Sequence, residues 1–291
     1  MTYLAIDVGG TAVKYGTFTP QGDLLSFAEK PTDTAHGPDA LVDALCEIVR
    51  AHPDCSRIGL SCTGQIDAAG ETMVFATAAL PGFIGYPLRS AFTTRAGKPV
   101  ALGNDVNCAA LGEARFGAGR DAQSFLCLTY GTGIGGAVYA GGIYLGSRGI
   151  AGEFGHMVTH AGGLPCVCGG QGCYEMYGST RALVRRVAEA VGETLNGRQI
   201  FERFDEAPIR REVDGWIDEI VTGLISLTHA FNPERLILGG GILNEGYVFQ
   251  QIEARLRQRL IESFRDVDVR RAELGNRAGV YGAYCLAAEM R

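Results

Sequence analysis

Apolar and polar residues alternate along this chain with two different repeats, and the change from one repeat to the other marks predicted strands and helices. Short apolar runs at 3–7 and 13–19, separated by glycines, predict a β-hairpin. Between 38 and 52 the apolar residues recur three and four positions apart, which is the spacing of one face of a helix. The run 57–64 returns to the strand pattern, so this part of the chain is expected to be an α/β unit.

The alternation of strands and helices continues to the C-terminus. A strand at 99–105 leads into a helix at 106–119, and residues 124–146 repeat the opening arrangement of strand, glycine turn and strand. Further elements are predicted as helices at 180–191, 213–231, 245–264 and 279–291 and a strand at 235–241. This order predicts two α/β lobes around a cleft, since helices must cover the sheets between which they alternate.

The length of the chain, 291 residues, is enough for two such lobes. We expect a small lobe over 1–103 and a large lobe over 104–278. The C-terminal helix, 279–291, is expected to return to the small lobe.

Composition and charge narrow the class of protein. The formal net charge is -6, which gives no electrostatic footprint for nucleic acid. The N-terminus has an acidic residue at position 7 and no basic start, so it predicts a cytoplasmic rather than a secreted protein. Residues 122–147 are uncharged, but seven of these 26 are glycine and several others are polar, which favours buried sheet over a membrane span.

Glycine is the most over-represented residue, with 42 copies, and 16 of them lie between 131 and 178. Two of the glycine turns sit between predicted strands, at 7–11 (DVGGT) and 131–136 (GTGIGG). Glycine lets backbone N–H groups approach phosphate oxygens, and threonine adds a hydroxyl donor. Ordinary hairpin turns are the alternative for either turn alone. The second turn also matches G-x-G-x-x-G, but a strand rather than a helix follows, which argues against a nicotinamide enzyme.

A third glycine turn, at 239–241, follows another strand and could hold a nucleotide base. The three turns together resemble those of the superfamily that contains actin, Hsp70 and the sugar kinases. The resemblance implies a two-lobed, actin-like ATPase (ribonuclease H-like) fold with ATP in the cleft. Asp7 would then hold Mg²⁺ through water, and Lys14 would approach phosphate. The predicted nucleotide-binding residues are Asp7, Gly9, Gly10, Thr11, Lys14, Gly131, Thr132, Gly133, Gly239, Gly240 and Gly241.

Three longer motifs make the resemblance more specific: 103-GNDVNCAALGE-113, 152-GEFGHM-157 and 166-CVCGGQGCYE-175. With the two phosphate turns, they resemble the ROK family of bacterial sugar kinases over nearly the whole chain, from Leu4 to Ala287. The resemblance implies ATP-dependent phosphoryl transfer to a hexose hydroxyl, usually O6, and a homodimer.

Asp105 is the candidate catalytic base. A sugar hydroxyl has a pKa far above 7, so its attack on phosphorus benefits from a nearby carboxylate. Helix capping is the alternative role for an aspartate at this position. The neighbouring Asn104 amide can pair with hydroxyls, and the family resemblance adds Gly64, Glu153, His156 and Glu175 as sugar-binding residues.

Nine cysteines are scattered along the chain, but three of them cluster at 166, 168 and 173, with His156 ten residues upstream. Three thiolates and an imidazole suit tetrahedral Zn²⁺. Chance cysteines in a glycine-rich loop are the alternative, and the family's structural zinc has the same spacing. The predicted ligands are His156, Cys166, Cys168 and Cys173, with the second nitrogen of His156 left for the sugar.

The sequence leaves the sugar open. Residues 61–67 (SCTGQID) and the stretch from Ala76 to Tyr86 are expected to face C2 of the sugar. Glucose or N-acetylmannosamine comes first, followed by N-acetylglucosamine or a β-glucoside. A non-catalytic ROK sugar sensor is the alternative class. It is disfavoured because only Met1 and Thr2 precede the first strand, which leaves no room for a DNA-binding arm.

Overall fold

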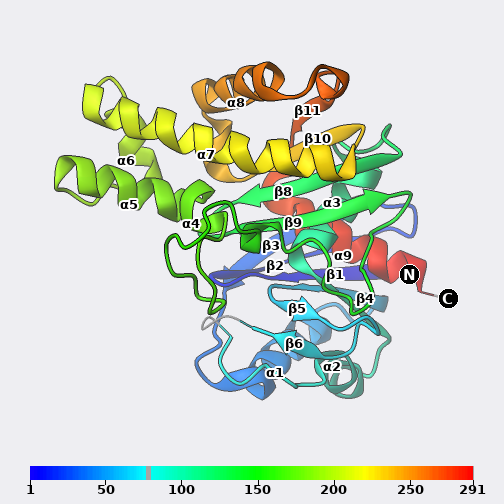
Figure 1. Ribbon diagram of the computed structural model, residues 1–291. Coiled ribbons are helices and arrows are strands. Elements are labelled where there is room, and N and C mark those ends of the chain that lie inside the picture. The colour runs from blue at the N-terminus through cyan, green and yellow to red at the C-terminus, as the bar shows by residue number, and fades with distance from the viewer. Residues whose placement is uncertain (77–79, 291) are drawn as a thin grey trace. The chain divides into compact units, whose positions relative to one another are not determined.

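The computed structural model describes residues 1–76 and 80–290, which divide into two compact units (Figure 1). The first unit holds residues 1–121, 137–151 and the C-terminal stretch that begins at 273, and the second holds 122–136 and 152–272. The expected boundary at 103 therefore lies inside the first unit. The reason is that the helix after this point packs on the C-terminal helix, so closely that a Cβ on Gly282 would stand 1.7 Å from the Cys108 carbonyl oxygen.

The first unit is built on a five-stranded sheet. Its order is β3 (Leu24–Pro31), β2 (Ala12–Phe18), β1 (Thr2–Val8), β4 (Cys55–Cys62) and β7 (Val100–Asn104). β1, β2 and β3 form an antiparallel meander, and β4 and β7 add to β1 in parallel. The carboxyl ends of the three parallel strands consequently meet at one edge, where open α/β sheets usually carry their ligands.

Helices cover both faces of this sheet. On one face, α1 (Gly37–Arg50) and α2 (Leu88–Ala96) bury apolar side chains against the core that includes Ile6 and Leu60. On the other face, α9 (Ala278–Glu289) packs against β1 and β4, and α3 (Asp105–Phe116) packs against α9. Ala5 and Phe18 are buried there together with Tyr284. A small ribbon of β5 (Gln65–Ile66) and β6 (Met73–Phe75) completes the unit.

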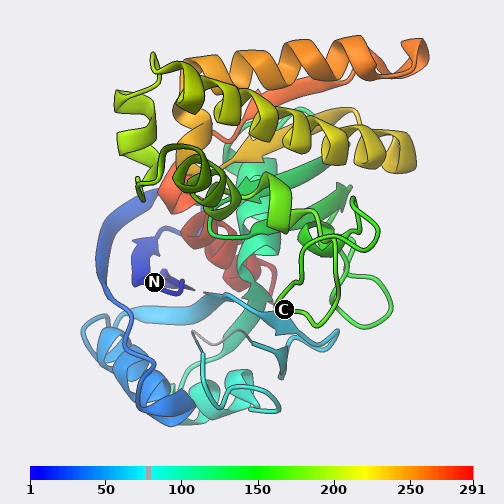
Figure 2. The ribbon, with the colours of Figure 1, turned by 60° about the vertical axis from the view of Figure 1, so that its left-hand side comes forward.

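The second unit contains most of a four-stranded sheet, in the order β11 (Asp268–Arg271), β10 (Arg235–Gly239), β8 (Ser124–Tyr130) and β9 (Ile134–Ala140). Helices α5 (Thr180–Val191), α7 (Ala207–Phe231) and α8 (Gly246–Arg259) lie side by side, as Figure 2 shows. Shorter helices are α4 (Glu175–Gly178) and α6 (Gly197–Glu202), with 3-10 turns at Phe154–His156, Gly241–Asn244, Glu262–Phe264 and, in the first unit, Gly275–Arg277.

Most predicted elements are confirmed, with differences at their ends. The helix predicted at 213–231 begins at Ala207, because Pro208 occupies its first turn, where the missing N–H costs nothing. The helix predicted at 245–264 ends at Arg259. The elements β3, α2 and β11 were not predicted, and β3 in particular is an edge strand with mostly exposed side chains. Within the described part of the chain, no helix combines the length and the apolar character that crossing a membrane would require.

Candidate functional site

Asp7 stands near the end of β1 with a partner on each side. In the register of the sheet it pairs with Lys14 on β2 and with Ser61 on β4. The Ser61 hydroxyl donates a hydrogen bond of 2.6 Å to Asp7 Oδ1. Burial raises the pKa of Asp7 above its usual value, while the Ser61 hydrogen bond and the positive charge of Lys14 act in the opposite direction.

The turn between β1 and β2 carries the other predicted phosphate-binding residues of the first unit. The Gly9 N–H donates to the Ala12 carbonyl at 3.0 Å and closes the turn. Gly10 and Thr11 at its tip are exposed, so their N–H groups and the threonine hydroxyl are open to a ligand. This arrangement suits a phosphate group.

Asp105 is the first residue of α3, and its neighbour Asn104 caps that helix. Asn104 Oδ1 accepts hydrogen bonds from the N–H groups of Val106 and Asn107, at 2.9 and 3.0 Å. The N-cap position, the alternative role considered for Asp105, is therefore held by Asn104, although Asp105 Oδ1 also accepts from the Val106 N–H at 3.0 Å. Asn104 Nδ2 donates to Asp105 Oδ1 at 2.8 Å and to the Gly64 carbonyl at 2.9 Å, so the amide orients the carboxylate and ties it to the end of β4.

The Asp105 carboxyl group has an unusual electrostatic setting. Burial raises its pKa from 3.8 to about 7, and the negative charge of Asp7 adds to this effect. A carboxylate with a pKa near the working pH is well matched to accept a proton during a reaction. In the first unit the structure thus brings five predicted residues to one edge of the sheet: Asp7, Lys14, Gly64, Asn104 and Asp105.

The second unit contains the other glycine turns. The Gly131 N–H donates to the Gly133 carbonyl at 3.0 Å, and the Gly131 carbonyl accepts from the N–H of Thr180 at 2.9 Å. The first residue of α5 is in this way tied to the turn between β8 and β9. Gly240 follows β10 with φ 123°, and a Cβ at this position would lie 2.2 Å from the Tyr130 carbonyl oxygen. Only glycine fits there.

A pocket of about 520 Å³ opens between these elements of the second unit. Its lining residues include Gly131, Thr132, Thr180, Arg181, Gly241 and Ile242. Thr180, Arg181 and Ile242 were not predicted, although Ser179 is a recognisable N-cap and a helix N-terminus favours anions. A second pocket, of about 550 Å³ around Phe116 and Arg277 in the first unit, lies away from the predicted residues.

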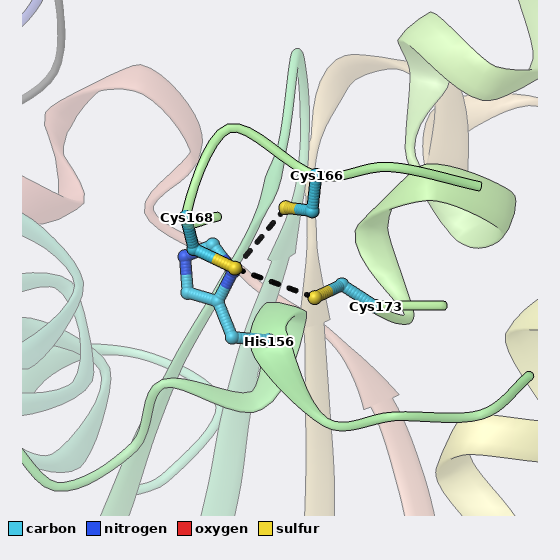
Figure 3. Close-up of side chains that lie close together, drawn as sticks. All are labelled: His156, Cys166, Cys168 and Cys173. Carbon is cyan, nitrogen blue, oxygen red and sulfur yellow. Dashed lines mark hydrogen bonds between the residues drawn. The ribbon is translucent and has the colours of Figure 1, made fainter. Parts of the chain in front are cut away.

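The predicted metal ligands converge (Figure 3). His156 ends a 3-10 turn and the three cysteines lie on the loop before α4, and their four ligand atoms are within 4.8 Å of one another. Cys168 Sγ is 3.6 Å from Cys173 Sγ, and Cys166 Sγ is 3.7 Å from His156 Nδ1. Tetrahedral zinc with bonds of about 2.3 Å separates its sulfur ligands by about 3.8 Å, so these residues fit a zinc ion.

The predicted sugar-binding residues of the second unit surround this cluster. His156 Nε2, the nitrogen turned away from the sulfurs, is 4.0 Å from Glu153 Oε2. Glu175 is buried, and its Oε1 is 3.3 Å from Cys166 Sγ. Its other oxygen lies against the turn between β8 and β9, since a Cβ on Gly133 would stand 2.5 Å from Glu175 Oε2. Glu175 therefore connects the cysteine loop with the glycine turn.

The family model described as "ROK family" matches residues 3–290. The chain belongs to the ROK family. It is 34% identical to a glucokinase of Streptomyces coelicolor, with 98% of this chain and 97% of that protein covered. It is also 32% identical to a β-glucoside kinase of Listeria monocytogenes, with 97% and 96% covered.

The fold comparison agrees with this membership. A ROK family glucokinase from Streptomyces griseus, solved in complex with glucose and AMPPNP, has a TM-score of 0.87 and is 32% identical, with the whole of both chains covered. The predicted family and the predicted two-lobed, actin-like α/β fold class are confirmed.

Proposed function

We propose that this ROK family member is an ATP-dependent hexose kinase that transfers the γ-phosphoryl group of ATP to the 6-hydroxyl of its sugar. The observation that carries the proposal is Asp105, a buried carboxylate with a raised pKa at the start of α3, where the N-cap position itself is held by Asn104. The sugar kinases among its relatives support the same reaction class.

In the proposed reaction, Asp105 accepts the proton of the sugar hydroxyl as its oxygen attacks the γ-phosphorus. The new O–P bond forms as the bond to the β-phosphate oxygen breaks, and ADP leaves. Gly10, Thr11 and the turn at Gly131–Gly133 would bind phosphate oxygens through N–H and hydroxyl groups. Mg²⁺, held through water by Asp7, would offset the charge that develops on the phosphate oxygens.

The pocket in the second unit supports nucleotide binding by this chain. Its volume of about 520 Å³ is in the range of small-molecule sites, and it opens beside the Gly131 turn and Gly241. We infer that the base and ribose of ATP bind here, with Thr180 and Arg181 at the start of α5 next to the phosphates.

Glu153, His156 and Glu175 are proposed to bind sugar hydroxyls, the glutamates through their carboxylate oxygens and His156 through a ring nitrogen. The loop that carries Cys166, Cys168 and Cys173, called the zinc loop below, would hold these side chains in place. The zinc would be structural, because all four positions of a tetrahedron are taken by His156 and the three cysteines. With Nδ1 on the metal, His156 Nε2 is left to meet a hydroxyl.

Relatives at nearly equal identity are named for different sugars, so we propose glucose or N-acetylmannosamine first and keep N-acetylglucosamine and β-glucosides as alternatives. The residues expected to select the sugar, 61–67 and 76–86, include 77–79, which lie outside the described residues. Ser61 is not kept in this proposed set, because its buried hydroxyl donates to Asp7. A homodimer is proposed as well, and light scattering would measure it.

The test is a coupled assay for ADP release over a panel of hexoses, N-acetylhexosamines and β-glucosides. We expect turnover with at least one of them and none with its 6-deoxy analogue. Asp105→Asn should lower kcat roughly 10²- to 10⁴-fold while it still binds the sugar. Sugar binding by the wild type without any ADP release would overturn the kinase proposal in favour of a sugar sensor.

A further inference from the structure

Ser61 is a polar residue inside the apolar strand β4, and no solvent reaches it. Its hydroxyl donates the 2.6 Å hydrogen bond to Asp7 Oδ1, and its backbone is in register with Asp7 in the parallel pair. The burial of a hydroxyl group costs free energy unless a hydrogen-bond partner offsets the loss of water. Here that partner is the carboxylate proposed to meet Mg²⁺.

The surroundings of the Asp7 carboxylate are tight on the other side too. A Cβ on Gly279, in the first turn of α9, would stand 2.5 Å from Asp7 Cγ. The helix therefore closes directly over the carboxylate, and Lys14 is its neighbour across the hairpin. Between these neighbours, the hydrogen bond from Ser61 to Oδ1 fixes which of the two carboxylate oxygens points toward β4.

The Ser61 hydroxyl has a second neighbour, the thiol of Cys108 on α3. Burial raises the pKa of Cys108 well above its usual value, the negative charge of Asp7 adds to this effect, and a hydrogen bond with Ser61 acts in the opposite direction. Cys108 lies on α3 and has no solvent exposure. Cys108 is thus a neighbour of Ser61, and among the described hydrogen bonds none joins Cys108 to the Asp7 carboxylate.

We propose that Ser61 is a positioning residue for phosphoryl transfer, which holds Oδ1 of Asp7 so that the carboxylate faces the Mg²⁺–nucleotide complex. This inference rests on the proposed kinase function and adds to it a residue that acts through Asp7. Loss of the hydroxyl should therefore weaken the metal–nucleotide complex and leave sugar binding as it is.

Three variants separate this role from packing. Ser61→Ala removes the donor, Ser61→Cys keeps the size with a weaker donor, and Cys108→Ala removes the neighbouring thiol but keeps the Ser61–Asp7 bond. Calorimetry would measure the affinity for AMPPNP with and without Mg²⁺, and the coupled assay would measure KM for Mg·ATP and for the sugar.

For Ser61→Ala we expect kcat/KM for Mg·ATP to fall roughly ten- to hundredfold, with the sugar KM within about twofold of the wild type. The gain in AMPPNP affinity on adding Mg²⁺ should shrink, and the affinity without Mg²⁺ should stay unchanged. Ser61→Cys should lie between Ser61→Ala and the wild type, and Cys108→Ala close to the wild type.

The inference is overturned if folded Ser61→Ala keeps the wild-type response to Mg²⁺, or if Ser61→Ala and Cys108→Ala weaken both substrates equally. Should Ser61→Ala fail to fold, Ser61→Cys decides by the same criteria. If the wild type releases no ADP with any sugar, only the kinase proposal fails. The calorimetry would still test the role of Ser61, because it compares Mg²⁺-dependent nucleotide binding between the variants.

Discussion

At the scale of single residues, Asn104 and Asp105 divide two tasks that the sequence alone does not separate. Aspartate and asparagine are both good helix caps, so the order Asn-Asp at a strand–helix junction leaves the capping residue undecided. The structure places the hydrogen bonds of the cap on Asn104, and this leaves Asp105 with a carboxyl group whose pKa burial raises to about 7. The environment, rather than the residue type, gives Asp105 its chemistry.

The raised pKa of Asp105 predicts how stability depends on pH. The folded state binds this proton more tightly than the unfolded state, so the contribution to stability is full below about pH 4 and is lost as the pH rises through about 7. Asp105→Asn cannot ionise and escapes this loss. The difference in Tm between Asp105→Asn and the wild type should therefore grow in favour of the variant from pH 5 to pH 8. A difference that stays constant over this range would contradict the buried, partly protonated carboxyl.

At the scale of elements, the sequence predicts those whose residues repeat with a clear period or carry a motif. The apolar runs of β1 and β4 and the apolar face of α1 are of this kind. By contrast, α2 has just two buried side chains, Leu88 and Phe92, so its sequence carries little helical periodicity. Thr180 escaped prediction, and Ser61 was expected to face the sugar rather than Asp7, because their contacts come from strands and turns that are distant in sequence.

Loss of the proposed zinc from the loop that carries Cys166, Cys168 and Cys173 should weaken sugar binding. Cys168→Ser removes an exposed ligand, and we expect zinc content measured by mass spectrometry to fall. Because His156 and Glu175 flank the cluster, the sugar KM should rise about tenfold, the equivalent of one charge-assisted hydrogen bond. Cys46→Ala, which removes a buried thiol of α1, should keep its zinc. A metal-free wild type with full sugar affinity would refute the assignment.

Glu113 anchors the turn that leads into α9. It is fully buried, and its carboxylate accepts hydrogen bonds from the N–H groups of Ala118, Glu273 and Leu274, at 2.8, 3.1 and 2.9 Å. Glu113→Ala should lower the free energy of unfolding by about 3 kcal/mol, because it leaves one buried and two part-buried backbone donors without their acceptor. Denaturant titration would measure this. Glu47→Ala, at an exposed position of α1, is the control, and equal effects of the two variants would argue against the anchor.

At the scale of the whole molecule, the proposed site residues are shared between the two units, and the family model matches residues 3–290, which include both. The predicted lobe boundary near 103 differs from the observed division, since sequence periodicity does not reveal which helices pack together. Likewise the stretch from 61 to 86, proposed to select the sugar, contains no motif that specifies which sugar it takes.

A sugar that binds only the folded protein should stabilise the whole chain. At about 100 times Kd the gain is about 2.7 kcal/mol, which corresponds to a rise in Tm of roughly 4–5 °C for a chain of this size. We expect the order of Tm shifts across the sugar panel to follow the order of kcat/KM. The 6-deoxy analogue of the best substrate should raise Tm without supporting ADP release. If a sugar that is turned over leaves Tm unchanged, the expected agreement between Tm shift and kcat/KM is wrong.

The return of α9 to the first unit has a consequence for the synthesis of the protein. Residues 273–290 close the sheet face that carries Ala5 and Phe18, yet they leave the ribosome after all of the second unit. At typical translation rates the first strands wait roughly 13 to 55 s for this cover. Until then an apolar surface of the nascent chain is open, so the N-terminal half is the part for which chaperones matter most.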